Sequence, residues 1–141
     1  MLTPTQKALV QGTFAAIAPI ADDAAVLFYR RLFEIDPSLE RMFQGDMAEQ
    51  RRRLMQMLTL AVKGLDRLDQ LVPVVQELGR RHAGYGVADK HYETVGVALL
   101  WTLEAGLGDA FTPEVEEAWT TVYGILASTM QDAAREAQAA A

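Results

Sequence analysis

The sequence predicts an all-α fold, a single bundle whose core is built from helix faces alone. Apolar residues recur at intervals of three and four along most of the chain, which places them on one face of an α-helix. The β-branched residues do not alternate with polar ones, so no stretch is typical of a strand. The prolines stand only at positions 4, 19, 37, 73 and 113, mostly where a helix is expected to begin or end. We therefore expect one helical domain over residues 1–141.

The N-terminal part of the chain predicts two helices. The run Thr3-Pro4-Thr5-Gln6 combines an N-cap, a proline at the first helical position and a glutamine able to close a capping box. This helix is expected to end near Pro19. A second helix is expected from about Asp22 to Glu34. Its inward residues should be those that share one helical face: Val26, Tyr29, Leu32 and Phe33.

A short turn and a longer helix should follow. Asp36-Pro37-Ser38 is typical of a restart of the chain as a short helical turn that leads to Phe43. After a connection over residues 44–46, a helix is expected from about Ala48 to Lys63. Its apolar stripe comprises Leu54, Leu58, Ala61 and Leu65.

Three further helices complete the prediction. Asp69 is expected to cap a helix whose stripe, Leu71, Val75 and Leu78, continues onto His82 before Gly84 breaks the pattern. The next helix should run from Asp89 to Gly106 and stop at Gly108. Thr112-Pro113-Glu114 is expected to start the last one. Its stripe comprises Val115, Trp119, Val122, Leu126 and Met130, and the alanine-rich end from about residue 131 is expected to fray.

Composition excludes several classes of function. Thirteen basic and nineteen acidic side chains give a net charge of −6, so nothing draws the protein to nucleic acid or to an anionic membrane surface. The absence of cysteine excludes disulfides and thiolate-held metals. No secretory signal pattern and no apolar run long enough for a bilayer are recognised, which predicts a cytoplasmic protein without membrane insertion.

Polar side chains interrupt three of the apolar faces: Tyr29, Gln50 and His82. Each of these residues could instead have a purely structural role. A tyrosine can reach water, a glutamine can lie in a first turn, and a core histidine can bond the carbonyl of Leu78. Together they favour a shared task inside a ligand cavity between facing helices. His91 lies nine residues from His82, so a two-histidine metal site on one helix is excluded.

Several motifs carry a resemblance to a known family. They are residues 27–33 (LFYRRLF), Asp36-Pro37 leading to Phe43, Gln50 with Leu54, residues 80–82 (RRH), His91-Tyr92 and residues 118–124 (AWTTVYG). Over nearly the whole chain this pattern resembles the single-domain bacterial haemoglobins, the lineage of Vitreoscilla-type haemoglobins and of the globin domain of flavohaemoglobins. The resemblance implies a globin fold that holds one haem b group, iron protoporphyrin IX.

The resemblance also implies roles for particular residues. His82 is the proximal ligand of the haem iron. Tyr29 and Gln50 are polar groups on the opposite, distal side, where Leu54 forms an apolar wall beside the bound ligand. Phe43 packs flat on the porphyrin, although an ordinary core phenylalanine would fit the same pattern.

The remaining cofactor contacts carried over from the family are mostly apolar or aromatic. The full set of cofactor-binding residues is Phe28, Phe43, Leu54, Arg81, His82, Tyr92 and Tyr123. The resemblance implies that Arg81 binds a haem propionate. Alternatively, Arg81 and Arg80 form solvated helix surface. The Arg51–Arg53 run is expected to be solvated helix surface. Trp119 and Tyr123 are expected to serve packing rather than chemistry.

The function implied is reversible O₂ binding, for storage or transport, with NO and CO as further ligands. The alternative is a nitric oxide dioxygenase supplied by an external reductase. Family members committed to that reaction pair the proximal histidine with a tyrosine and a glutamate. Tyr92 matches the tyrosine, but Ala134 stands at the glutamate position and Glu136 lies about 200° round the helix from it. A haem-based gas sensor acting through a partner protein and a haem-free helical module would also fit the sequence.

Overall fold

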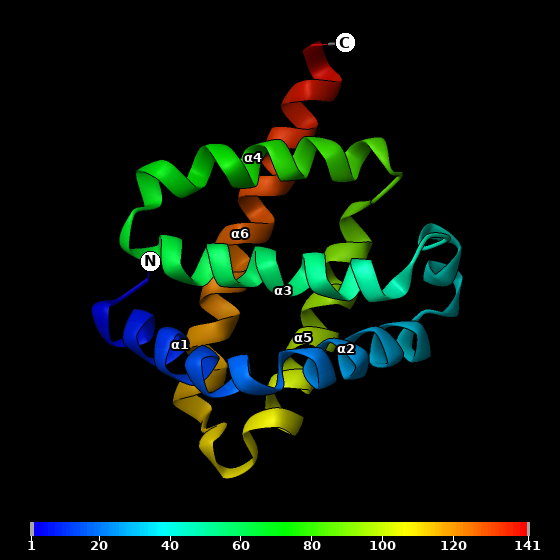
Figure 1. Ribbon diagram of the computed structural model, residues 1–141. Helices are drawn as coiled ribbons and strands as arrows, with labels where there is room; N and C mark the ends of the chain where they lie inside the picture. Colours follow the sequence, from blue (N-terminus) through cyan, green and yellow to red (C-terminus); the bar gives the residue numbers. More distant parts are fainter. Residues whose placement is uncertain (1, 141) are drawn as a thin grey trace.

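The computed structural model describes residues 2–140, and this part of the chain is helical throughout apart from short connections (Figure 1). The all-α prediction is confirmed. The first and last residues of the expected domain, 1 and 141, lie outside the described residues. The α-helices are α1 (Pro4–Ile17), α2 (Ala21–Ile35), α3 (Met47–Lys63), α4 (Leu68–Gly84), α5 (Asp89–Leu107) and α6 (Pro113–Ala140). Short 3₁₀ turns join them: η1 (Ala18–Ile20), η2 (Pro37–Met42), η3 (Gly64–Asp66) and η4 (Gly108–Ala110).

Side chains cap the start of several of these elements. At the start of α1 the Gln6 amide donates to the Thr3 hydroxyl at 3.1 Å and the Thr3 amide donates to the Gln6 side chain at 3.0 Å, as a capping box requires. The Asp36 carboxylate accepts from the Ser38 amide at 3.1 Å and so begins η2. Gly108 ends α5 with a φ of 57°, a conformation that favours glycine.

Two expectations about helix faces and caps are wrong. Asp69 does not cap α4, because the helix begins at Leu68 and Asp69 lies inside its first turn, where its charge still complements the helix dipole. Val26 is 45% exposed rather than inward. The buried face of α2 is centred on Phe28, and Val26 lies two residues away from it, about 200° round the helix.

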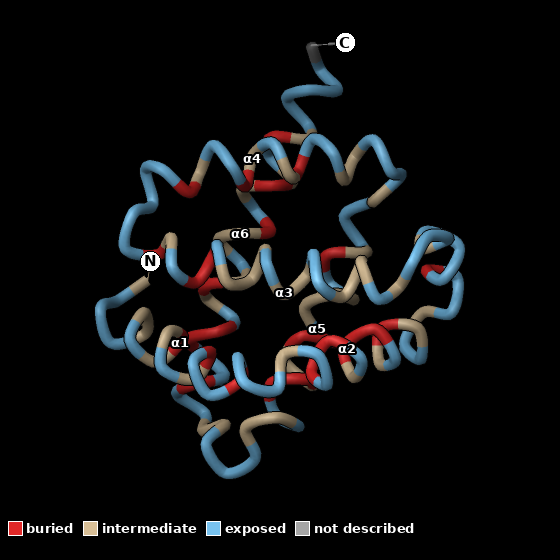
Figure 2. Tube along the Cα trace, in the orientation of Figure 1, coloured by how far each residue is buried: buried red, intermediate tan, exposed pale blue. Residues whose placement is uncertain are grey.

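The helices pack in pairs around one main core. α2 packs against α5, α1 against α6, and α4 against α6, while α3 rests mainly on α2 (Figure 1). Figure 2 shows buried residues along the inward stripes of these helices. The Trp119 ring is 2% exposed, and its indole N–H donates to the Thr13 hydroxyl at 2.9 Å, which ties α6 to α1. α3 and α4 follow each other in the chain but make little direct contact, so they leave space between them.

One stretch, Pro4–Ile35, meets the length and composition expected of a membrane span, with a mean hydropathy of 1.2 in its best window. No apolar run long enough to span a bilayer was predicted from the sequence. In the structure the stretch is two helices separated by η1, and Phe14 and Ile17 of α1 are buried in the main core. Core helices pass the same test of hydropathy, so this segment is weak evidence for a membrane span.

The last helix is longer than the sequence predicts. α6 continues through Ala140, whereas fraying was predicted from about residue 131. Ala133 is 4% exposed, so burial extends the helix beyond the predicted limit.

Candidate functional site

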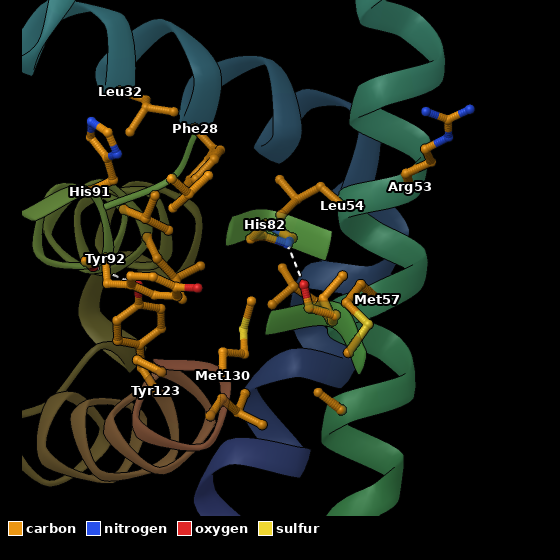
Figure 3. A pocket seen from close by; sticks show the side chains of 18 of the residues that line it. Phe28, Leu32, Arg53, Leu54, Met57, His82, His91, Tyr92, Tyr123 and Met130 are labelled. Carbon is orange, nitrogen blue, oxygen red and sulfur yellow. Dashed lines mark hydrogen bonds between the residues drawn. The ribbon is translucent and has the colours of Figure 1, made fainter. Parts of the chain in front are cut away.

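An apolar cavity of about 280 Å³ lies between α3 and α4 and is closed by α2, α5 and α6. Its size is just below the range of ligand pockets, roughly 300–1,000 Å³. Nearly all of its wall is hydrocarbon, supplied by leucine, valine, methionine and aromatic side chains. Figure 3 shows how side chains from these helices converge on it. The cavity is therefore suited to a largely apolar ligand.

His82, on the last turn of α4, lines this cavity and is half-buried. Its Nδ1 lies 2.8 Å from the Leu78 carbonyl oxygen, the bond drawn dashed in Figure 3. Because a carbonyl only accepts, Nδ1 carries the proton and Nε2 keeps a free lone pair. Burial lowers the pKa of His82, and the Leu78 bond opposes this only in part. The ring is therefore neutral at pH 7 with Nε2 unprotonated, which is the form that ligates metals.

A purely structural role for His82 and a metal-binding role would both use the hydrogen bond to Leu78. A core histidine bonded to Leu78 would need nothing at Nε2 except space. A metal-binding histidine uses such a bond to fix its ring orientation and tautomer. His82 lines a large apolar cavity, and this position favours the metal-binding role.

Tyr29 and Gln50 form a hydrogen-bonded pair. Tyr29 on α2 is 6% exposed and lines the cavity, and the Gln50 side-chain amide donates to its hydroxyl oxygen at 3.1 Å. Burial raises the pKa of Tyr29, and the Gln50 bond lowers it by less, so the hydroxyl stays protonated. Since Gln50 occupies an acceptor position of that oxygen, the O–H proton is left free to donate. Gln50 thus contacts the site through Tyr29 rather than lining the cavity itself.

Aromatic rings hold Tyr29 in place. The ring centroids of Phe28 and Phe43 lie 5.0 Å and 5.4 Å from that of Tyr29, both in edge-on geometry. Phe33 lies 6.1 Å away and also packs against Phe43 at 5.6 Å. Phe28, Phe43 and Leu54 all line the cavity, as the sequence analysis expected of cofactor-contacting residues.

Tyr92 and Tyr123 lie together at another wall of the cavity. The Tyr123 hydroxyl donates to the Tyr92 backbone carbonyl, the second dashed line in Figure 3. Burial raises the pKa of both phenols, most strongly for Tyr123, so both stay protonated. In the described part of the chain the Tyr92 hydroxyl has no hydrogen-bond partner, which leaves a polar group available at the cavity wall.

The structure does not bring Arg81 to the cavity. Its side chain is 64% exposed and lies 3.8 Å from Glu77 on the same helix. Arg53 lines the cavity instead, although its charged group points away toward solvent in Figure 3 and pairs with Glu49 at 2.8 Å. From the sequence, Arg53 was predicted only as helix surface. It lies three residues after Gln50, however, and therefore on the same side of α3 as Gln50.

Other lining residues were also missed. His91 lines the cavity, and its Nδ1 accepts from the Ala88 amide at 2.8 Å at the start of α5. From the sequence, His91 served to exclude a paired-histidine site and formed part of the His91-Tyr92 motif, but it was not predicted to contact the cofactor. Met57 and Met130 line the cavity as well, and Met130 was predicted only as core. Methionines at helical spacing give no signal that separates a cavity wall from ordinary packing.

The side chains at the cavity can be compared with the ligands that a metal centre requires. No cluster of three or more histidine and carboxylate side chains capable of holding a metal ion exists between residues 2 and 140. Two imidazoles line the cavity, but the Nδ1 lone pair of His91 accepts from the Ala88 amide, which leaves His82 as the imidazole with a lone pair free. One such imidazole at an apolar cavity is suited to an iron atom whose other ligands come from a bound macrocycle. His82, the flat ring of Phe43 and the hydrocarbon walls therefore fit haem.

The fold and cavity define an all-α protein with an apolar ligand site that is lined by His82, an imidazole suited to metal ligation. The globin family model matches residues 26–130, and the chain belongs to the globin family. Family membership implies haem-based binding of small gases. The predicted bacterial globin lineage is confirmed by the relatives as well.

Two kinds of relative are similar to this chain. The flavohemoprotein of Bordetella parapertussis (strain 12822) is 32% identical over the whole chain, which spans 36% of that protein. The flavohemoprotein of Bacillus subtilis (strain 168) is 30% identical over 84% of the chain and 31% of its own length. Neuroglobin of Danio rerio is 30% identical over 92% of the chain and 90% of its own length. The chain thus spans about a third of the flavohemoproteins it matches.

Proposed function

We propose that this globin holds haem b in the cavity between α3 and α4, with His82 as the iron ligand, and that it binds O₂ reversibly for storage or transport. The observation that carries the proposal is that His82, whose Nδ1 is bonded to the Leu78 carbonyl, and Tyr29 line the same apolar cavity. When bound, haem supplies an iron atom with one coordination position open to a small gas.

In this proposal Tyr29 selects the ligand. Its free O–H donates a hydrogen bond to O₂, which becomes a good acceptor when polarised, whereas CO stays a poor one. A hydrogen bond to a partly charged acceptor contributes about 1.5–3 kcal/mol. Gln50 fixes the hydroxyl through its 3.1 Å bond, and the flanking rings of Phe28 and Phe43 limit its rotation.

The apolar walls serve a second purpose. Phe28, Phe43 and Leu54 line the cavity with hydrocarbon, which disfavours the entry of water. If haem is held there, this dry, apolar lining would stabilise poorly the separated charges that oxidation by O₂ would produce. These side chains therefore support reversible binding over oxidation.

Absorption spectra of the purified protein in its ferric, ferrous, oxygenated and CO-treated forms test this proposal. We expect a five-coordinate ferrous form that takes up O₂ reversibly. His82→Ala should abolish the wild-type spectrum, with Gln76→Ala on α4 as the matched control. A protein that stays colourless with ample haem, or a His82→Ala variant with wild-type spectra, would contradict the proposal.

A second candidate function is nitric oxide dioxygenation with a separate reductase as partner. It is favoured by the similarity to flavohemoproteins and by Tyr92, whose hydroxyl lines the cavity without a partner in the described residues. Against it, Glu136 is exposed and Ala134 supplies no carboxylate. Rapid formation of nitrate from NO and O₂ with an added reductase would favour this candidate over storage.

We further propose that residues 1–141 act as one globin domain in the cytoplasm, with O₂, NO and CO as ligands. Cell fractionation of the native host, with the haem absorbance followed in each fraction, tests the location. Haem recovered mainly with membranes or in the medium would contradict it.

A further inference from the structure

The helix that carries His82 depends on a single neighbouring helix for its position. α4 packs extensively on α6 and otherwise contacts mainly η3, the turn that precedes it (Figure 1). Across the cavity it makes little contact with α3. The distance between α4 and α6 therefore determines where the end of α4 lies relative to the cavity.

Gly79 lies at the closest approach of these two helices. The buried residues of α4 are Leu71, Val75 and Gly79, which recur every four residues and form the ridge that meets α6. A Cβ at Gly79 would lie 2.3 Å from the Met130 carbonyl oxygen and 2.5 Å from its Cα. These are backbone atoms of α6, so they cannot yield as the end of a flexible side chain does.

We propose that Gly79 is a positioning residue for His82: by lacking a Cβ it lets α4 rest directly on the backbone of α6, and this contact sets how far the imidazole reaches into the cavity. The inference rests on the proposed function, in which His82 holds the haem iron. His82 follows Gly79 by less than one helical turn, so a rigid shift of α4 moves both residues together. Ordinary contact begins at 3.4 Å, so an alanine at position 79 must move the helices apart by on the order of 1 Å.

The first experiment compares Gly79→Ala with Gly84→Ala. Gly84 lies on the same helix and a Cβ there meets nothing within 4 Å, so the control introduces the same methyl group without a collision. The readouts are the iron–imidazole stretching frequency of the ferrous, ligand-free protein, measured by resonance Raman, and the rate of haem loss to an acceptor protein. We expect Gly79→Ala to shift the stretch and to raise haem loss by about 10- to 100-fold. Gly84→Ala should match wild type in both.

The second experiment detaches the ligand from α4. In His82→Gly supplied with free imidazole, the ligand no longer depends on the position of the helix. The iron–imidazole stretching frequency of this variant should differ from that of wild type. Adding Gly79→Ala to the variant should leave that frequency unchanged. This comparison of wild type with the detached form remains decisive if Gly79→Ala alone does not fold.

The outcomes separate the inference from the function on which it rests. If Gly79→Ala only lowers the free energy of unfolding, with the stretch and haem loss equal to those of Gly84→Ala, Gly79 serves packing alone and the inference is overturned. An identical stretch in wild type and in the detached form also overturns it, because α4 then imposes no position. If His82→Gly keeps the wild-type spectrum without imidazole, the proposed function itself fails.

Discussion

At the scale of the residue, the site is governed by which atoms are left free after local hydrogen bonds are made. The Leu78 carbonyl accepts a hydrogen bond from Nδ1 of His82, which leaves the Nε2 lone pair free. The Gln50 amide donates to the Tyr29 oxygen, which leaves the hydroxyl proton free to donate. Tyr29→Phe should therefore raise the O₂ dissociation rate by about 10- to 100-fold, because a charge-assisted hydrogen bond is lost. Stopped-flow displacement of O₂ by CO measures this rate. A change below about twofold would remove Tyr29 from the mechanism.

Gln50 should act only through Tyr29. Gln50→Leu removes the amide that orients the hydroxyl, so we expect a smaller rise in O₂ dissociation than for Tyr29→Phe. In the Tyr29→Phe background the same change should add little, since the hydroxyl is already gone. Gln56→Leu, an exposed glutamine on the same helix, is the matched control. Independent, additive effects of the two substitutions would indicate that Gln50 reaches the ligand by itself.

At the scale of the element, one polar link joins the N-terminal helix to the turn before α4. Asp66 of η3 lies 2.9 Å from Lys7 and accepts from Gln11 at 3.1 Å, and both partners lie on α1. The Lys7 and Gln11 bonds hold the pKa of Asp66 below its ordinary value of 3.8. Because the folded pKa is the lower one, the stabilisation is present above pH 3.8 and is lost as the pH falls through the folded pKa.

Asp66→Asn should accordingly be less stable than wild type at neutral pH, and the difference should shrink below pH 3.8. Urea unfolding of both proteins over a pH series measures this. Asp109→Asn, which removes a carboxylate without an ion pair in the described residues, is the control. A stability difference that does not depend on pH would contradict the link.

Most elements could be predicted from the sequence because their signals are local. The Thr3 capping box, the Asp36 turn and Gly108 each act within a few residues of the position they determine. Val26 could not be placed, because the face of α2 that turns inward depends on where α5 lies. The same limit applies to Arg53, since only the packing of α3 decides which surface residues reach the cavity. Arg81 lies outside the cavity lining and near Glu77, so its contact with a haem propionate stays a prediction.

At the scale of the whole molecule, α4 relies mainly on one helix partner, α6. It packs on α6 on one side and borders the cavity on the other, whereas α5 is packed by α2, α6 and α1. Without haem, backbone amides of α4 should exchange with deuterium faster than those of α5, because separating α4 from α6 alone exposes most of the buried face of α4. Loading with haem should protect α4, and mass spectrometry of peptides before and after loading measures the change. Equal protection of both helices without haem would contradict this view of the cavity.

The position of Trp119 has a practical consequence. Its buried indole borders the cavity, whereas the second indole, Trp101, is partly exposed and lies beneath the guanidinium of Arg31 at 5.3 Å. A pigment seated in that space would accept excitation energy from the nearby indole. Native fluorescence thus offers a gauge of cofactor loading that requires no attached dye.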